Sequence, residues 1–144
     1  MNNGGDAAEQ VVRLSLEGME VALKLTGAGA KNIAVLLYSI LKEEQKTKGK
    51  SRLDNMLRSG KELKVFTIKN EDLKKFQSEA KRYGVLFCAL KSRGKSVDGM
   101  VDIMVRAEDA SKINRIVDRF NLATVDTASI KSEIQKSKDS KDKG

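Results

Sequence analysis

The sequence predicts an α+β fold: a ferredoxin-like, or split βαβ, core preceded by two or three N-terminal helices. Three observations lead to this prediction. A segment rich in β-branched and aromatic residues, 62–68, is followed by an amphipathic helical segment, 70–83. Two apolar segments, 85–91 and 100–106, flank a polar loop. A second amphipathic helical segment, 107–120, completes the order strand, helix, strand, strand, helix of the split βαβ motif.

The N-terminal third predicts helices. From Asp6 to Leu25, apolar residues recur at nearly the three- and four-residue spacing of an amphipathic helix, and Lys31 to Lys46 continue with a more apolar helical pattern. The glycines of "TGAGA" separate the two segments, and we interpret them as a helix breaker. We expect a helical hairpin over 1–46 and a basic connector over 47–61, in which Ser51 caps a short third helix.

The predicted α+β domain spans 62–125, with Leu122 to Val125 as a candidate further edge strand. Alternation along its two hairpin strands places apolar side chains on both faces of the sheet. The two helices of the core cover one face, so the other is covered by the N-terminal helices or by a second subunit. We expect a homo-oligomer, although the sequence leaves both arrangements open. Residues 126–144, rich in Ser, Lys and Asp, predict a flexible tail.

The charge favours a polyanion or an acidic protein surface as partner. The chain has 28 Lys and Arg against 20 Asp and Glu, a net charge of +8, and half of this excess falls in residues 38–61. DNA is therefore a candidate partner, and the same segment could equally be a solvated connector. The candidate phosphate contacts are the cations of this segment and of the hairpin loop: Lys42, Lys46, Lys48, Lys50, Arg52, Arg58, Lys91, Arg93 and Lys95.

Composition argues against an enzyme. The chain has no His and one cysteine, Cys88, so the usual general base, the usual zinc ligand and any thiolate cluster are missing. We interpret Cys88, which falls in an apolar strand, as a core residue. "GKS" occurs at Gly49–Ser51 and at Gly94–Ser96, but Glu44 and Ala89 stand where a Walker A loop needs its first glycine. We expect no catalytic residue, no cofactor and no metal.

The apolar segments are too short for a membrane span. The longest run, Ile33 to Leu41, has nine residues, against roughly 20 for a helix that crosses a bilayer. The N-terminal "MNNGGDAAEQ" lacks the basic and apolar regions of a secretory signal. We therefore expect a cytoplasmic protein.

Two patterns in the second half of the chain carry a resemblance to a known family. They are "F...A..YGV.F...K" at Phe76, Ala80, Tyr83, Gly84, Val85, Phe87 and Lys91, and "A.DA" at Ala107, Asp109 and Ala110. With these patterns the chain resembles the PcfB family of small proteins from conjugative plasmids and integrative conjugative elements of Gram-positive bacteria. The resemblance covers about Glu9 to Phe120, and the chain departs from the family at "VDIMVRAED", where aromatics and a lysine are common.

The resemblance implies an accessory role in conjugative DNA transfer, with the coupling ATPase and the relaxase as partners. It carries no catalytic residues over to this chain. We expect a non-enzymatic accessory protein that binds DNA at the relaxosome or docks on the coupling ATPase. The alternative is a protein-interaction module with no direct nucleic-acid contact.

Overall fold

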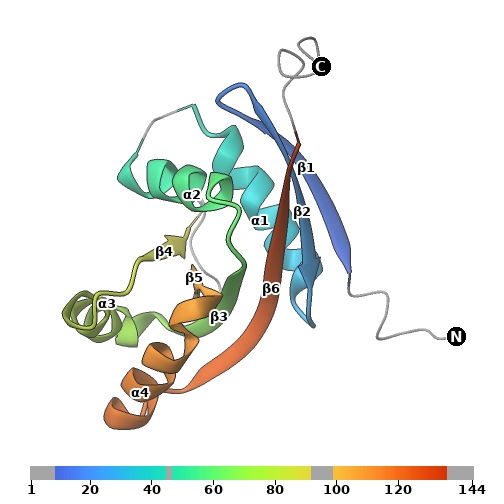
Figure 1. Cartoon of the computed structure of the whole chain (residues 1–144). Coiled ribbons are helices and arrows are strands. Elements are labelled where there is room, and N and C mark those ends of the chain that lie inside the picture. Colours follow the sequence, from blue (N-terminus) through green and yellow to red (C-terminus); the bar gives the residue numbers. More distant parts are fainter. Residues whose placement is uncertain (1–8, 45–46, 92–98, 136–144) are drawn as a thin grey trace, which may run out of the picture.

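The computed structural model describes residues 9–44, 47–91 and 99–135, and within them six antiparallel strands form one curled sheet, a half-barrel (Figure 1). The strand order across the sheet is β1-β2-β6-β3-β5-β4. A 3-10 turn precedes each of α3 and α4. The elements are β1 (Gln10–Leu16), β2 (Met19–Thr26), α1 (Ala30–Lys42), α2 (Lys48–Arg58), β3 (Leu63–Lys69), α3 (Leu73–Arg82), β4 (Phe87–Leu90), β5 (Met100–Arg106), α4 (Ala110–Phe120) and β6 (Thr124–Gln135).

The predicted first helix is wrong, because residues 10–26 form the hairpin of β1 and β2. Every second residue of β1 and β2 points to the core, including Val12, Leu23 and Leu25, which are buried. Glu17 and Gly18 form the two-residue turn, with φ values of 50° and 78°. Two positive φ values in succession match the twist of a hairpin, so this turn fixes the register of the strands.

The ferredoxin-like core preceded by helices is also wrong, because strands lead the chain and the sheet continues beyond the predicted core. The order strand, helix, strand, strand, helix over 63–120 is present. The next strand, β6, pairs with β3 on one side and with β2 on the other. It therefore joins the N-terminal hairpin to the rest of the sheet, and Figure 1 shows it bending along the whole molecule.

The predicted flexible tail is wrong over 126–135, because these residues belong to β6. Ala128 and Ile130 are buried at 3% and 0% exposure, while Lys131 and Glu133, which follow them, are exposed. The segment looks tail-like in composition because its outward positions are polar. Residues 136–144 lie outside the described residues.

Two apolar cores lie on opposite faces of the sheet, as β3 shows by alternation. Leu63 and Val65 pack with α1 and α2, whereas Phe66 and Ile68 pack with α3 and α4. The second face of the sheet is thus covered by helices of the same chain, which is one of the two expected arrangements. Self-association stays a prediction and is not needed to cover either core.

The "TGAGA" segment is a strand-to-helix turn between β2 and α1, not a break between two helices. It packs on a bulge of β6 at Thr127, where the register with β3 shifts. The Gly29 backbone N–H donates to the Thr127 carbonyl oxygen at 2.9 Å, and Gly27 has φ +116°, which favours glycine. The turn and the bulge therefore fix where α1 begins.

Membrane insertion through a helix finds no support in the described parts of the chain. None of their helices is long and apolar enough to cross a bilayer. The apolar run at Ile33 to Leu41 lies within α1, and its buried side chains pack on the sheet.

Candidate nucleic-acid interface

Helix α2 lies in the segment that was predicted as a basic connector with a short helix. Thr47 caps its N-terminus, since its hydroxyl oxygen accepts the Lys50 backbone N–H at 3.1 Å. The apolar residues Leu53, Met56 and Leu57 are buried against the sheet. This periodicity leaves the cations of the first turn on the outer side of the helix.

Contacts between α2 and β4 position this first turn. The Arg52 guanidinium donates from Nη1 to the Phe87 carbonyl oxygen at 3.3 Å and lies over the Phe87 ring, 5.6 Å from its centroid. The Cys88 thiol lies 3.6 Å from the Gly49 carbonyl oxygen. β4 is an edge strand of the sheet, and Lys91, the residue after it, lines the same groove as Lys50 and Arg52.

We define the α2–β4 basic surface as Lys48, Lys50, Arg52 and Lys91. Two grooves cross it. One, of about 290 Å³, is lined by Lys50, Arg52 and Lys91 together with Glu43 and residues of β4. The other, more open and of about 550 Å³, is lined by Thr47, Lys48, Ser51, Arg52, Asn55 and Leu86, none of which is acidic.

The other predicted contacts lie elsewhere. Lys42 is exposed in the last turn of α1, and the Lys50 ammonium donates to the Glu43 carbonyl oxygen just after that turn. Arg58 lies about 12 Å along α2 from Lys50, from a rise of 1.5 Å per residue. It binds Asp54 Oδ1 at 2.8 Å, and this hydrogen bond raises the pKa of Arg58. Lys46, Arg93 and Lys95 lie outside the described residues.

Sequence reasoning missed two parts of this surface. Thr47 directly precedes "KGKS", and a Thr just before a helical segment is the signal for a cap. Leu86 was assigned to the strand predicted over 85–91, but it precedes β4 and is 42% exposed in the open groove. No local pattern indicates that exposure, because it depends on where α2 packs.

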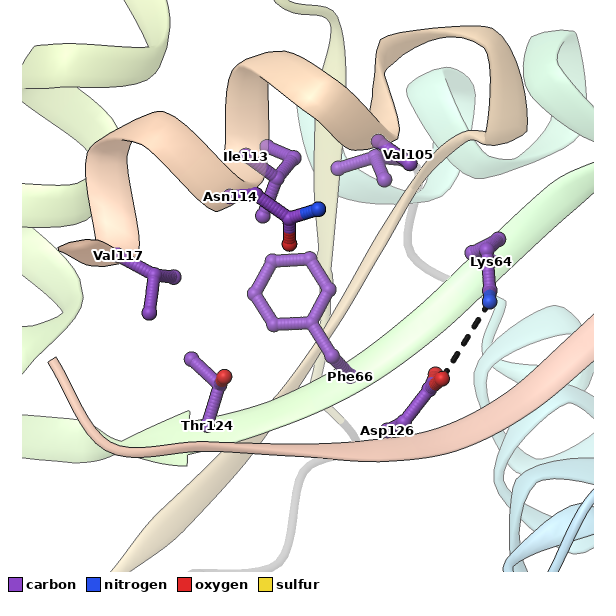
Figure 2. A pocket seen from close by; sticks show the side chains of 9 residues that line it. Lys64, Phe66, Val105, Ile113, Asn114, Val117, Thr124 and Asp126 are labelled. Atoms are coloured by element: carbon purple, nitrogen blue, oxygen red, sulfur yellow. Dashed lines mark hydrogen bonds and ion pairs between the residues drawn. The ribbon is translucent and has the colours of Figure 1, made fainter.

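A third hollow, a cleft of about 220 Å³, lies between α4 and strands β3 and β6 (Figure 2). Phe66 lies at its centre, with Ile113 and Val117 of α4 beside it. Across its opening, Lys64 Nζ lies 3.4 Å from Asp126 Oδ2. Five of its nine lining residues are apolar, and its one cation, Lys64, is paired with the carboxylate of Asp126, so this cleft suits a polyanion less well than the α2–β4 basic surface does.

Cys88 is a core residue in the structure, as interpreted from the sequence. Its side chain is 2% exposed, and burial raises the pKa of its thiol to about 11, an effect that the nearby Arg52 charge partly opposes. The thiol is therefore protonated at neutral pH and a poor nucleophile. No group of three or more potential metal-ligating side chains occurs among the described residues.

Comparison with known proteins gives one match. A family model described as "Protein of unknown function (DUF3801)" matches residues 30–143. The chain belongs to the DUF3801 family. The match runs from the start of α1 past the end of β6, so it includes the whole α2–β4 basic surface and leaves out the β1–β2 hairpin. Searches of curated proteins and of solved structures found no match.

Proposed function

We propose that this DUF3801 protein is a non-enzymatic, cytoplasmic accessory protein of conjugative DNA transfer that binds the DNA backbone through its α2–β4 basic surface. The DUF3801 family is associated with conjugative elements of Gram-positive bacteria, which supports the biological setting. The resemblance to the PcfB family supports the same setting and makes the relaxase and the coupling ATPase the expected protein partners.

One observation carries the DNA-binding part of the proposal: two distant chain segments bring their cations to one surface. Lys48 and Arg52 come from α2, and Lys91 follows β4. In DNA-binding proteins, Lys and Arg side chains of this kind supply much of the affinity for the phosphate backbone. The N-terminus of α2 faces the same surface and adds a partial positive charge.

The arrangement suits backbone contacts better than base-sequence readout. Its cations and hydroxyls suit phosphate oxygens, and the apolar side of α2 packs on the sheet, so this helix is not free to enter a groove of DNA. Four phosphate contacts predict a log–log slope of affinity against salt of about −3 to −4. We expect the affinity to depend little on the DNA sequence, because backbone contacts do not read bases.

The test is a salt titration of DNA binding with matched charge variants. Lys48→Gln with Lys91→Gln removes two exposed cations of the surface, and should flatten the slope by about 1.8 on duplex DNA or about 1.4 on single strands. Lys31→Gln with Lys131→Gln removes two exposed cations elsewhere and is the control. Equal salt slopes for both variants would show that the α2–β4 basic surface does not contact the DNA.

A second candidate is docking on a protein such as the coupling ATPase, without nucleic-acid contact. Val35 and Tyr38 favour it, because both are exposed, at 59% and 41%, and lie three residues apart on one side of α1. A protein that binds no DNA even at low salt would make this the leading function. Val35→Ser with Tyr38→Ser should then abolish binding to the purified ATPase.

A further inference from the structure

We infer that the α2–β4 basic surface takes single-stranded DNA in preference to duplex; this rests on the proposed function and names its substrate. The observation behind it is Leu86, which is 42% exposed in the open groove. The other side chains that line this groove are polar or charged. A lone exposed leucine is ordinary, but here it lies among the cations that would hold the phosphates.

Leu86 distinguishes the two forms of DNA by what they expose. A duplex stacks its bases and presents phosphates, so it would contact Lys48 and Lys91 and leave Leu86 in water. A single strand can turn an unstacked base toward the protein, and an apolar side chain beside a cation gives that base a surface to cover.

Arg52 completes this surface. Bases stack on guanidinium planes as well as on aromatic rings. The Arg52 guanidinium is held by the Phe87 carbonyl oxygen at 3.3 Å and by the Phe87 ring, so little freedom is lost when a base packs against it. Arg52 and Leu86 line the same groove, flanked by Lys48.

The size of the groove is compatible with this occupant. A volume of about 550 Å³ falls within the range of small-ligand sites, which is roughly 300 to 1,000 Å³, and the groove is open enough for a chain to enter and leave. Asn55 lies on its wall and offers an amide for hydrogen bonds to a base edge, although its Oδ1 also accepts from Arg58 at 2.7 Å.

The test compares an oligothymidine with a duplex of equal length, by fluorescence anisotropy at several salt concentrations. Leu86→Ser should weaken single-strand binding roughly three- to tenfold, as expected for loss of a partly buried leucine, and leave duplex binding and both salt slopes unchanged. Arg52→Lys keeps the charge but not the planar group, and should likewise reduce the preference for single strands.

An intrinsic probe makes the test direct, because the chain has no Trp. In Leu86→Trp, stacking of a base on the new ring should quench its fluorescence when oligothymidine is added. Val11→Trp, at a position that is 55% exposed on β1, is the matched control and should not respond.

The outcomes separate this inference from the proposed function. Equal affinity for duplex and oligothymidine, with no quenching at position 86, would overturn the single-strand inference and leave backbone binding in place. Absence of binding to both would overturn the proposed function itself. Quenching by an acidic peptide, but by neither DNA, would identify the groove as a protein-docking site and overturn both.

Discussion

Substitutions in the turn between β2 and α1 test the packing that organises the fold. An added Cβ at Gly29 would overlap the Thr127 Cγ2 methyl on the bulge of β6. An added Cβ at Gly27 would lie 2.8 Å from the Thr127 carbonyl oxygen and 3.0 Å from the Ala128 Cα, and Gly27 also has φ +116°. The first overlap involves a side-chain methyl, whereas the second involves backbone that cannot move without breaking the sheet.

These contacts set the expected losses of stability. Gly29→Ala should cost about 1–3 kcal/mol, as for other overpacked sites. Gly27→Ala combines overpacking with an unfavourable φ and should cost about 3–5 kcal/mol. At roughly 3 °C for each kcal/mol in a chain of this size, the melting temperature should fall by about 3–9 °C and about 9–15 °C.

If the added Cβ at Gly29 overlaps the Thr127 methyl, removing that methyl should restore the stability lost in Gly29→Ala. Thr127→Ser removes the Cγ2 methyl but keeps a hydroxyl for the 2.6 Å contact with Thr67 Oγ1. It should restore most of the stability lost in Gly29→Ala and little of that lost in Gly27→Ala. Gly18→Ala, where φ is +78° and no atom lies within 4 Å of the added Cβ, measures the cost of positive φ alone.

Urea unfolding followed by circular dichroism measures all of these variants. Additive effects of Gly29→Ala and Thr127→Ser would refute the proposed contact between the turn and the bulge. So would a loss in Gly27→Ala no larger than that in Gly18→Ala.

Two other predictions follow from the buried strands. A chain that ends at Asp126 should lose cooperative unfolding, because β6 pairs with both β2 and β3; a sharp thermal transition in that truncated chain would contradict this topology. Cys88 should react with a thiol reagent at pH 8 only as the protein unfolds. Because burial raises its pKa from 9.0 to about 11, its contribution to stability is complete below pH 9 and falls as pH rises through 11. Unfolding free energies of wild type and Cys88→Ala across this range would show no such difference if the thiol were exposed.

Local sequence signals predicted the middle of the chain well. The β-branched residues before Asn70 and the amphipathic pattern up to Gly84 correspond to β3 and α3. The "A.DA" pattern also has a structural explanation: Asp109 is 4% exposed at the start of α4 and accepts from Arg106 Nε at 3.1 Å. The strand β3, the helix α3 and the contact of Asp109 with Arg106 all depend on residues close together in the sequence. Local sequence patterns can therefore indicate them.

The ends of the sheet could not be predicted in the same way. In β1 and β2 the apolar spacing fits a helical pattern as well as the alternation of strands. The structure shows a hairpin, because Glu17 and Gly18 take the positive φ values of a two-residue turn. Strand β6 has polar outward positions and gains its stability from pairing with strands far away in sequence. The intrinsic strand propensity of a residue does not indicate which distant strand it will pair with.

The candidate site was predicted in part for the same reason. Charge density identified Lys48, Lys50 and Arg52, and Lys91 was included as part of the hairpin loop. Their meeting on one surface depends on the contact between Arg52 and Phe87, which are 35 residues apart. Leu86 became a candidate for DNA binding only once the structure placed it beside Arg52 in the open groove.

The most direct test of the central claim is an NMR titration of the uniformly ¹⁵N-labelled 15.9 kDa protein with oligothymidine. The DNA-binding account predicts that amide shifts change most in two segments, 47–55 and 86–91, which together form the α2–β4 basic surface. The changes should disappear as salt is raised. Shift changes confined to the β1–β2 hairpin or to α4, with 47–55 and 86–91 unaffected, would contradict it.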